Sequence, residues 1–269
     1  MKTSRFRLAA ALAGALVASA SAAGAHEMFL KPASYYVASN ARTVVALFNG
    51  TYDKSENPIT RDRMKTVAVA AGGKVTPPAT SQWRDDKVTS YLDLTVGDPG
   101  TYVVAVSTAS RIIELSADNF EEYLRHDGIE DTLKAREAEK GPRASVKERY
   151  SKHVKTILQV GDALTDDYAR PLGLPAEIVL AQNPAAVKVG DTLGFRALLK
   201  GKPMVGQLVY AGVDGGPPKA VKLRTGADGE GRFKITQPGK WYVTLINMEK
   251  ATGEAHYESN WSTLTFEVR

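Results

Sequence analysis

The feature that most constrains the fold is a succession of short β-branched runs, each ended by a turn signal. Residues 43–48 stop at the turn pair Asn49-Gly50, and residues 91–96 alternate between apolar and polar side chains. The segment 97–100 (Gly-Asp-Pro-Gly) then turns the chain into the apolar run 102–106. Alternating runs bounded by Gly, Pro, Asn and Asp predict β-strands, and hairpins of this kind are typical of β-sandwiches.

Two stretches interrupt the strand pattern. Between residues 117 and 138 the apolar side chains recur at helical spacing with Gly128 as a break, which predicts two short helices. Residues 164–175 form an irregular connection with Pro171, Gly173 and Pro175, and they are the predicted domain boundary. We therefore expect a mainly β chain with two β-sandwich modules, residues 26–163 and 176–269, and a short helical insertion between them.

The N-terminus has the pattern of a secretory signal peptide. Lys2, Arg5 and Arg7 precede a ten-residue apolar core, and small residues follow, ending in Ala23-Gly24-Ala25. This is an A-x-A cleavage site, whereas the alternative, a retained membrane anchor, needs a longer apolar segment. We expect cleavage after residue 25, a mature chain that begins at His26, and export to a bacterial periplasm. The chain has no cysteine, so a lipoprotein anchor is excluded.

Composition excludes several further classes. Without cysteine the chain has no disulfide scaffold, iron–sulfur cluster, thiolate zinc site or cysteine nucleophile. The 35 basic and 30 acidic residues give +5, and loss of the three basic residues of the signal leaves 32 against 30, or +2. There is no block of Lys and Arg, so nucleic acid is not an expected partner. The sequence Glu27 to Leu30 after His26 lacks the second His of a zinc-protease motif, and no hydrolase, kinase or transferase motif occurs.

A histidine at the mature N-terminus is the strongest candidate for chemistry. His26 would offer two nitrogens, the α-amino group and ring Nδ1. An α-amino pKa of about 7.7–8.0 leaves that group partly deprotonated at neutral pH, so it can bind a metal. With one more histidine the site would suit Cu(II) best, and Ni(II) or Co(II) next. The alternative is that His26 is first by chance.

Three other histidines could supply the further ligand. His153 lies in an alternating stretch on the side shared by Ser151 and Lys155, where it could instead face solvent. His256 lies close to a loop or strand edge, and the sequence does not choose between these two. His126 follows Glu122 on a charged helix face and is expected to be a solvated helix residue. The predicted metal residues are thus His26, His153 and His256.

Four segments carry a resemblance to a known family: residues 26–32 (HEMFLKP), 149–155 (RYSKHVK), 173–179 (GLPAEIV) and 257–266 (YESNWSTLTF). The mature chain resembles domain-of-unknown-function family 4198, exported bacterial proteins often labelled periplasmic components of a cobalt or nickel transport system. The resemblance implies a secreted β-sandwich protein linked to metal handling, with His26 at the position of the family's opening histidine. Met28-Phe29 departs from the more aromatic pair expected there. The second half also resembles the transthyretin-type β-module. Both predicted modules are expected to be immunoglobulin-like or transthyretin-like β-sandwiches.

Three functional hypotheses follow. The first is a periplasmic metal-binding or metal-delivery protein for nickel, cobalt or copper that serves a membrane transporter component. The second is a non-enzymatic β-sandwich interaction module of such a transport system, in which His26 is incidental. The third is a copper oxidase that binds its metal through the N-terminal histidine. We rank them in this order, and do not expect an enzyme.

Overall fold

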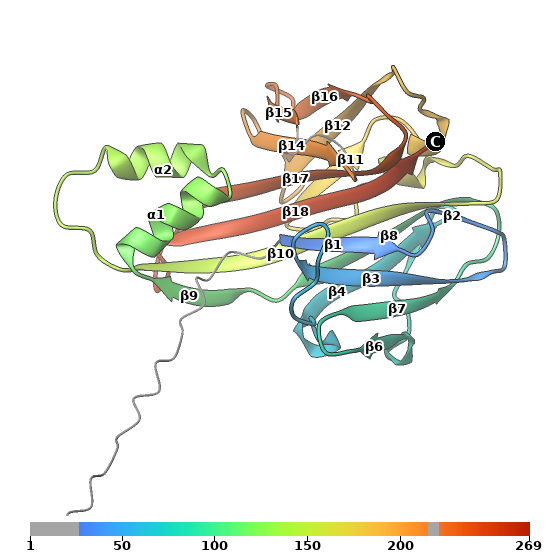
Figure 1. The fold of residues 1–269 in the computed structure, drawn as a ribbon, viewed down its shortest axis with the longest axis horizontal. Helices are drawn as coiled ribbons and strands as arrows, with labels where there is room; N and C mark the ends of the chain where they lie inside the picture. The colour runs from blue at the N-terminus through green and yellow to red at the C-terminus, as the bar shows by residue number, and fades with distance from the viewer. Residues whose placement is uncertain (1–26, 215–220) are drawn as a thin grey trace, which may run out of the picture.

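The computed structural model describes residues 27–214 and 221–269, which form three β-sheets and two α-helices (Figure 1). The predicted signal peptide and His26 lie outside the described residues. The N-terminal sheet contains, in spatial order, β1 (Glu27–Pro32), β3 (Arg42–Gly50), β7 (Ser90–Thr95) and β6 (Trp83–Asp85).

A long sheet of ten strands runs through the middle of the molecule. Its main path, in spatial order, is β15 (Val221–Arg224), β14 (Leu208–Val213), β17 (Gly239–Lys250), β18 (Tyr257–Val268), β10 (Val146–Val160), β8 (Gly100–Thr108), β4 (Met64–Ala71) and β5 (Lys74–Thr76). Two further strands pair with β10, namely β2 (Tyr36–Val37) and β9 (Arg111–Leu115). β10 and β18 run parallel, whereas β17 and β18 form a long antiparallel hairpin.

The C-terminal sheet has four strands: β11 (Ala176–Leu180), β12 (Thr192–Leu199), β13 (Lys202–Pro203) and β16 (Glu230–Lys234), which pairs with β12. Short 3₁₀ turns connect the strands: η1 (Arg61–Arg63), η2 (Thr80–Gln82), η3 (Asp166–Ala169) and η4 (Pro184–Ala186).

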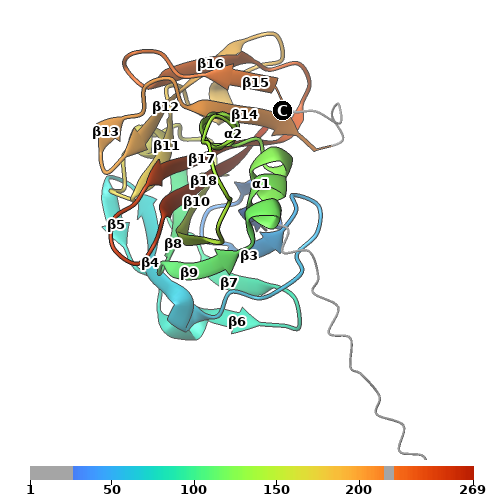
Figure 2. The ribbon, with the colours of Figure 1, turned by 90° about the vertical axis from the view of Figure 1, so that its left-hand side faces the viewer.

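The three sheets stack as layers, with the long sheet in the middle (Figure 2). Adjacent residues of a strand point to opposite faces, and on β10 Leu158 joins one core while Ile157 joins the other. Val104 and Val103 of β8 divide in the same way. The long sheet therefore contributes to an N-terminal core on one face and a C-terminal core on the other.

The long sheet contains strands from both halves of the chain. A mainly β chain with two short helices is confirmed. The division into two modules is not confirmed, because β4, β8 and β10 from before the 164–175 connection share one sheet with β14, β17 and β18 from after it.

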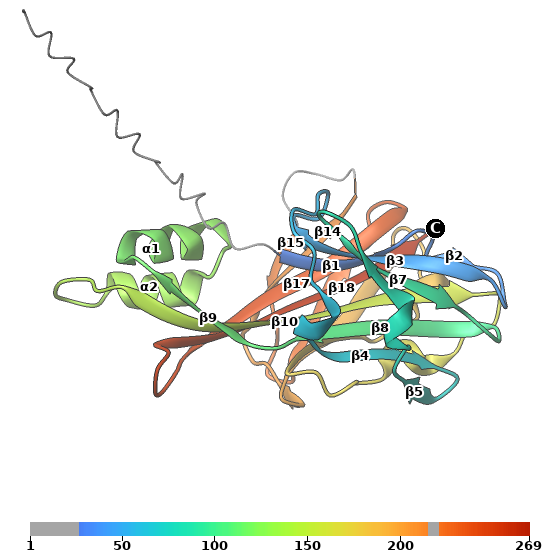
Figure 3. The same cartoon turned by 90° about the horizontal axis from the view of Figure 1, so that it is seen from below.

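The helices lie at one end of the molecule, beside the β17–β18 hairpin (Figures 1 and 3). α1 (Ala117–His126) begins at Ser116, whose side chain accepts a hydrogen bond from the Asn119 amide, a usual N-cap arrangement. Its apolar face, with Phe120, packs with Trp261 of β18 in a small third core. α2 (Glu130–Glu137) follows after a tight turn. Neither helix is long and apolar enough to cross a membrane.

The turn between the helices requires glycine. Gly128 has φ of +69°, a backbone conformation that side chains disfavour. A Cβ there would lie 2.3 Å from the hydroxyl oxygen of Tyr210 on β14. The predicted break at Gly128 is thus also a point of close contact between the helices and the long sheet.

Candidate functional site

The first described residue, Glu27, is fixed where the N-terminal sheet meets the long sheet. Two threonines of β18 hold β1 in place: Thr263 Oγ1 donates to the Met28 carbonyl at 2.7 Å and Thr265 Oγ1 donates to the Leu30 carbonyl at 2.5 Å. The Thr244 hydroxyl of β17 donates to the Glu27 carboxylate at 3.4 Å. Glu27 is therefore held against β17, at the end of β1 that continues to residue 26.

Glu27 lines a polar cavity of about 230 Å³. The turn from Asp127 to Thr132 forms one wall, and β14 and β17 form others. Tyr210, Thr244 and Asn247 contribute polar groups to the lining. The cavity therefore brings together the start of β1, the helix junction and the long sheet, segments that are about a hundred residues apart in the chain.

Two carboxyl groups influence each other in this cavity. Loss of hydration, and after it the negative charge of Asp127, raise the pKa of Glu27 to about 7. His126 Nδ1 lies 2.6 Å from an Asp127 carboxylate oxygen, and this hydrogen bond raises the pKa of the histidine. The His126 ring is exposed, whereas the Asp127 carboxyl is buried. Imidazole and carboxylate groups in such proximity can bind a proton or a cation.

A buried cation and a buried acid of β10 interact electrostatically with the carboxyl groups of this cavity. Lys152 of β10 donates from Nζ to the Asn49 side-chain oxygen at 2.9 Å, and burial lowers its pKa to about 8. Glu148, also on β10, accepts hydrogen bonds from the Tyr123 hydroxyl at 3.1 Å and from Ser259 Oγ. Burial raises the pKa of Glu148. The Tyr123–Glu148 contact attaches α1 to the long sheet, whereas the Lys152–Asn49 contact joins β10 to β3.

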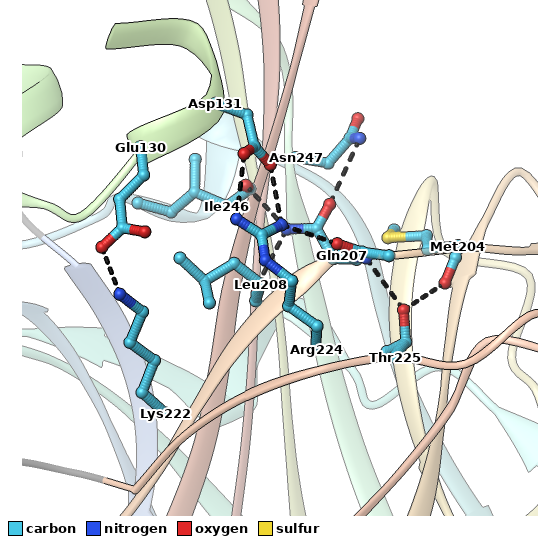
Figure 4. A network of polar contacts seen from close by, with 11 residues as sticks. Glu130, Asp131, Met204, Gln207, Leu208, Lys222, Arg224, Thr225, Ile246 and Asn247 are labelled. Carbon is cyan, nitrogen blue, oxygen red and sulfur yellow. Dashed lines mark hydrogen bonds and ion pairs between the residues drawn. The ribbon is translucent and has the colours of Figure 1, made fainter. Parts of the chain in front are cut away.

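Ion pairs fix the other wall of the cavity (Figure 4). Arg224 of β15 binds both carboxylate oxygens of Asp131 at 2.8 and 2.9 Å and also donates to the Gly206 carbonyl. Lys222 pairs with Glu130 on the same turn of α2. The start of α2 is thereby attached to the edge of the long sheet, and Glu130 and Asp131 are each paired with a cation. Glu27 differs from these two acids, because loss of hydration and the negative charge of Asp127 raise its pKa.

His153 is deeply buried in β10, with 1% of its surface exposed. Its Nδ1 lies 2.6 Å from Ser107 Oγ, and its Nε2 lies 3.1 Å from Ser151 Oγ and 3.2 Å from the Asn260 side-chain oxygen. Burial lowers the pKa of the ring to about 4. Both nitrogens are thus used inside the protein, and the ring is neutral at pH 7.

His256 lies in the turn between β17 and β18, some distance along β18 from the residue that pairs with His153. It is exposed, and its Nδ1 accepts a hydrogen bond from the Lys147 amide at 2.9 Å. In the parallel β10–β18 register, His153 is opposite Ser262, whereas Glu148 is opposite Tyr257, the neighbour of His256. A separation of about six residues along a strand corresponds to about 20 Å. The structure therefore does not bring His153 and His256 together.

Sequence reasoning missed Asp127 and gave His126 no role in a site. The pair stands at the end of an amphipathic helix just before a glycine, a local signal that could have drawn attention to it. Its proximity to Glu27 has no local signal. Within residues 27–214 and 221–269 no three His, Asp or Glu side chains form a group that could hold a metal ion. A metal site at this cavity would therefore require a ligand from outside those ranges.

Comparisons with solved structures give only distant similarity. The chain is similar to the D0-D1 domain of intimin at 12% identity and a TM-score of 0.22, covering 89% of this chain and 97% of that one. It is similar to murine CEACAM1b at 9% identity and a TM-score of 0.21, covering 91% and 98%. For trypsin-activated alpha-2-macroglobulin from Escherichia coli the values are 8% and 0.25, covering 90% of this chain and 16% of that one.

No curated protein sequence matches the chain. The sequence profile described as "Domain of unknown function (DUF4198)" matches residues 23–249. This match covers most of the chain, including both helices, the cavity and nearly all of β17. The chain belongs to the DUF4198 family.

Proposed function

We propose that this chain is an exported protein that binds a nickel, cobalt or copper ion through the N-terminal residue His26 and delivers it to a membrane transport component in the periplasm. One observation carries the proposal. Glu27, the residue next to His26, lies in a polar cavity with Asp127 and near His126. The peptide bond keeps the Cα atoms of residues 26 and 27 about 3.8 Å apart.

The donor types fit a divalent transition metal. After signal cleavage His26 supplies an amine nitrogen and an imidazole nitrogen, His126 supplies a second imidazole, and Glu27 and Asp127 supply carboxylates. Nitrogen ligands suit Cu, Ni and Co, and the affinity of such sites follows the order Co below Ni below Cu. Because the metal must displace protons from its ligands, the raised pKa of Glu27 makes its carboxyl a group that can exchange a proton for a metal.

The role of the other two predicted ligands changes in this proposal. His153 acts as a neutral hydrogen-bonding residue of the interior. His256 lies at the hairpin end, where it serves the β10–β18 pairing through the Lys147 amide. His126 takes their place as the second histidine of the site.

The two-module layout is part of the same proposal. The N-terminal core consists entirely of residues between Met28 and Val160. The C-terminal core comes mainly from residues between Ala176 and Val268, with three additions from earlier strands. In this view each core defines one β-sandwich module, and the modules share the long sheet.

Substitutions in the cavity test the site. In the mature protein that begins at His26, we expect Asp127→Asn and His126→Gln each to weaken Ni(II) binding about tenfold, a typical loss for a ligand or the group that orients it. His256→Gln is the matched control, since it removes a histidine far from the cavity, and it should leave the affinity unchanged. Calorimetric titration gives the affinities. Equal losses in His126→Gln and His256→Gln would contradict the assignment.

A further inference from the structure

A second cavity lies at the other end of α2, where basic side chains predominate. It has a volume of about 410 Å³ and lies between the end of α2, the segment 139–146 and the tip of the β17–β18 hairpin. Its lining includes Arg136, Lys140, Arg143 and Lys250. The acids of the metal site do not line it.

One lining residue is a buried arginine whose hydrogen bonds are incomplete. Arg136 is 8% exposed, yet its Nε has no hydrogen-bond partner among the described residues. Its nearest carboxylate is that of Glu121, with 3.6 Å between Arg136 Nη2 and Glu121 Oε1, longer than a charge-assisted hydrogen bond. The guanidinium also lies over the Phe120 ring, 5.1 Å from its centroid, which fixes its position. A buried donor without a partner is costly, and a ligand oxygen would satisfy it.

The remaining charges leave this cavity positive. Glu121 is shared between Arg136 and Arg143. Glu139, the acid in the lining, pairs with Lys250 at 3.0 Å. Lys140 is exposed and has no ion-pair partner among the residues that the structure describes. The cavity region therefore has four basic side chains (Arg136, Lys140, Arg143 and Lys250) and two carboxylates (Glu121 and Glu139).

His256 adds a directional donor at the same place. It lines the cavity, and its Nδ1 accepts the hydrogen bond from the Lys147 amide. In a neutral imidazole the other nitrogen then carries the hydrogen. Nε2 can therefore donate to a ligand oxygen.

We propose that this cavity binds a small oxyanion, a phosphate or carboxylate group, through Arg136, Lys140, Arg143 and His256. Planar guanidinium groups match the oxygens of phosphate and carboxylate groups. The site is separate from the proposed metal centre and uses none of its residues.

The test is calorimetric titration of the mature protein with inorganic phosphate and, separately, with citrate. We expect saturable binding of at least one probe, and the probe that binds identifies the group as phosphate or carboxylate. Lys140→Glu should weaken that binding about tenfold, the range expected for a charged contact. Lys87→Glu, which makes the same charge change at an exposed lysine of the β6–β7 loop, should have little effect.

Two results would overturn the proposal. One is the lack of saturable binding of both phosphate and citrate by the unsubstituted protein. The other is an equal loss of affinity in Lys140→Glu and Lys87→Glu, since this would indicate general attraction by net charge. Because Lys140 is exposed, its substitution should preserve the fold, and far-UV circular dichroism checks this.

Discussion

The buried ion pair between Lys155 and Glu177 offers a quantitative test of how the sheets are held together. Lys155 lies on β10 of the long sheet and Glu177 on β11 of the C-terminal sheet, with Nζ and Oε1 2.9 Å apart. The two residues are 2% and 1% exposed. Glu177 also accepts hydrogen bonds from the backbone amides of Leu172, at 2.6 Å, and Gly173, at 3.0 Å. The pair therefore joins two layers and the 164–175 connection.

The substitution Lys155→Met should lower the free energy of unfolding by about 3–5 kcal/mol, because it leaves a carboxylate buried without its cation. The loss should lie toward the lower end, since the two backbone amides still donate to Glu177. Arg84→Met is the matched control. Arg84 and Asp93 are equally close, at 3.0 Å, but about half exposed, and such a surface pair contributes about 0–1 kcal/mol.

Urea denaturation followed by circular dichroism measures both variants, with the slope of the transition used to check two-state behaviour. If Lys155→Met does not fold, Glu177→Gln keeps an acceptor and removes the charge, and its loss should still exceed that of Arg84→Met. Equal losses in the buried and exposed variants would refute the reasoning that burial sets the value of this pair.

Two further predictions concern the helix turn and the interior histidine. Gly128→Ala should destabilise the protein more than Gly72→Ala, because both glycines have φ in the left-handed region (+69° and +56°) but only the first substitution adds a Cβ 2.3 Å from Tyr210. Chemical denaturation measures both losses, and equal losses would contradict the close contact. Burial lowers the pKa of His153 to about 4 in the folded protein, whereas a histidine in the unfolded chain has a pKa near 6.5. The contribution of His153 to the free energy of unfolding is therefore complete above pH 6.5 and is lost as the pH falls toward 4. This loss is about 3 kcal/mol. The variant His153→Gln should therefore flatten the dependence of the unfolding free energy on pH between pH 6.5 and 4. If the variant has the same slope as the unsubstituted protein, His153 is not the source of the pH dependence.

Local sequence patterns predicted local structure well. In residues 91–96 the alternation is confirmed, with Leu92 and Leu94 buried and Asp93 exposed. The helical spacing between 117 and 138 corresponds to α1 and α2. These patterns succeed because each element has one face toward a core and one toward water.

The strand β10 shows why the same reasoning fails in the middle of the fold. Both of its faces are covered by other sheets. Lys155 is therefore buried, although the sequence pattern left open that its side of the strand faces solvent. The strand also begins at Val146, within a charged stretch. Glu148 is buried there because Tyr123 and Ser259 supply hydrogen bonds. Such partners come from distant segments, and no local pattern reveals them.

The proposed site was accessible to sequence reasoning to the same extent. The cleavage pattern predicts His26 as the first mature residue, whereas the cavity depends on the β1 register and the helix turn, which bring Glu27 near Asp127 across 100 residues. Spacing along the chain could not identify His126 as a histidine close to Glu27. Its choice requires the packing of α1 on β18.

The most direct test of the central claim compares two forms of the mature protein. One begins at His26, verified by mass spectrometry, and the other carries a single extra alanine before it, which removes the terminal amine from His26 but leaves every side chain in place. Calorimetry and visible absorption follow titration with Cu(II), Ni(II) and Co(II). The account predicts tight binding by the first form and a loss of at least about tenfold in the second. Equal affinity in the two forms would contradict a metal site at the N-terminal histidine.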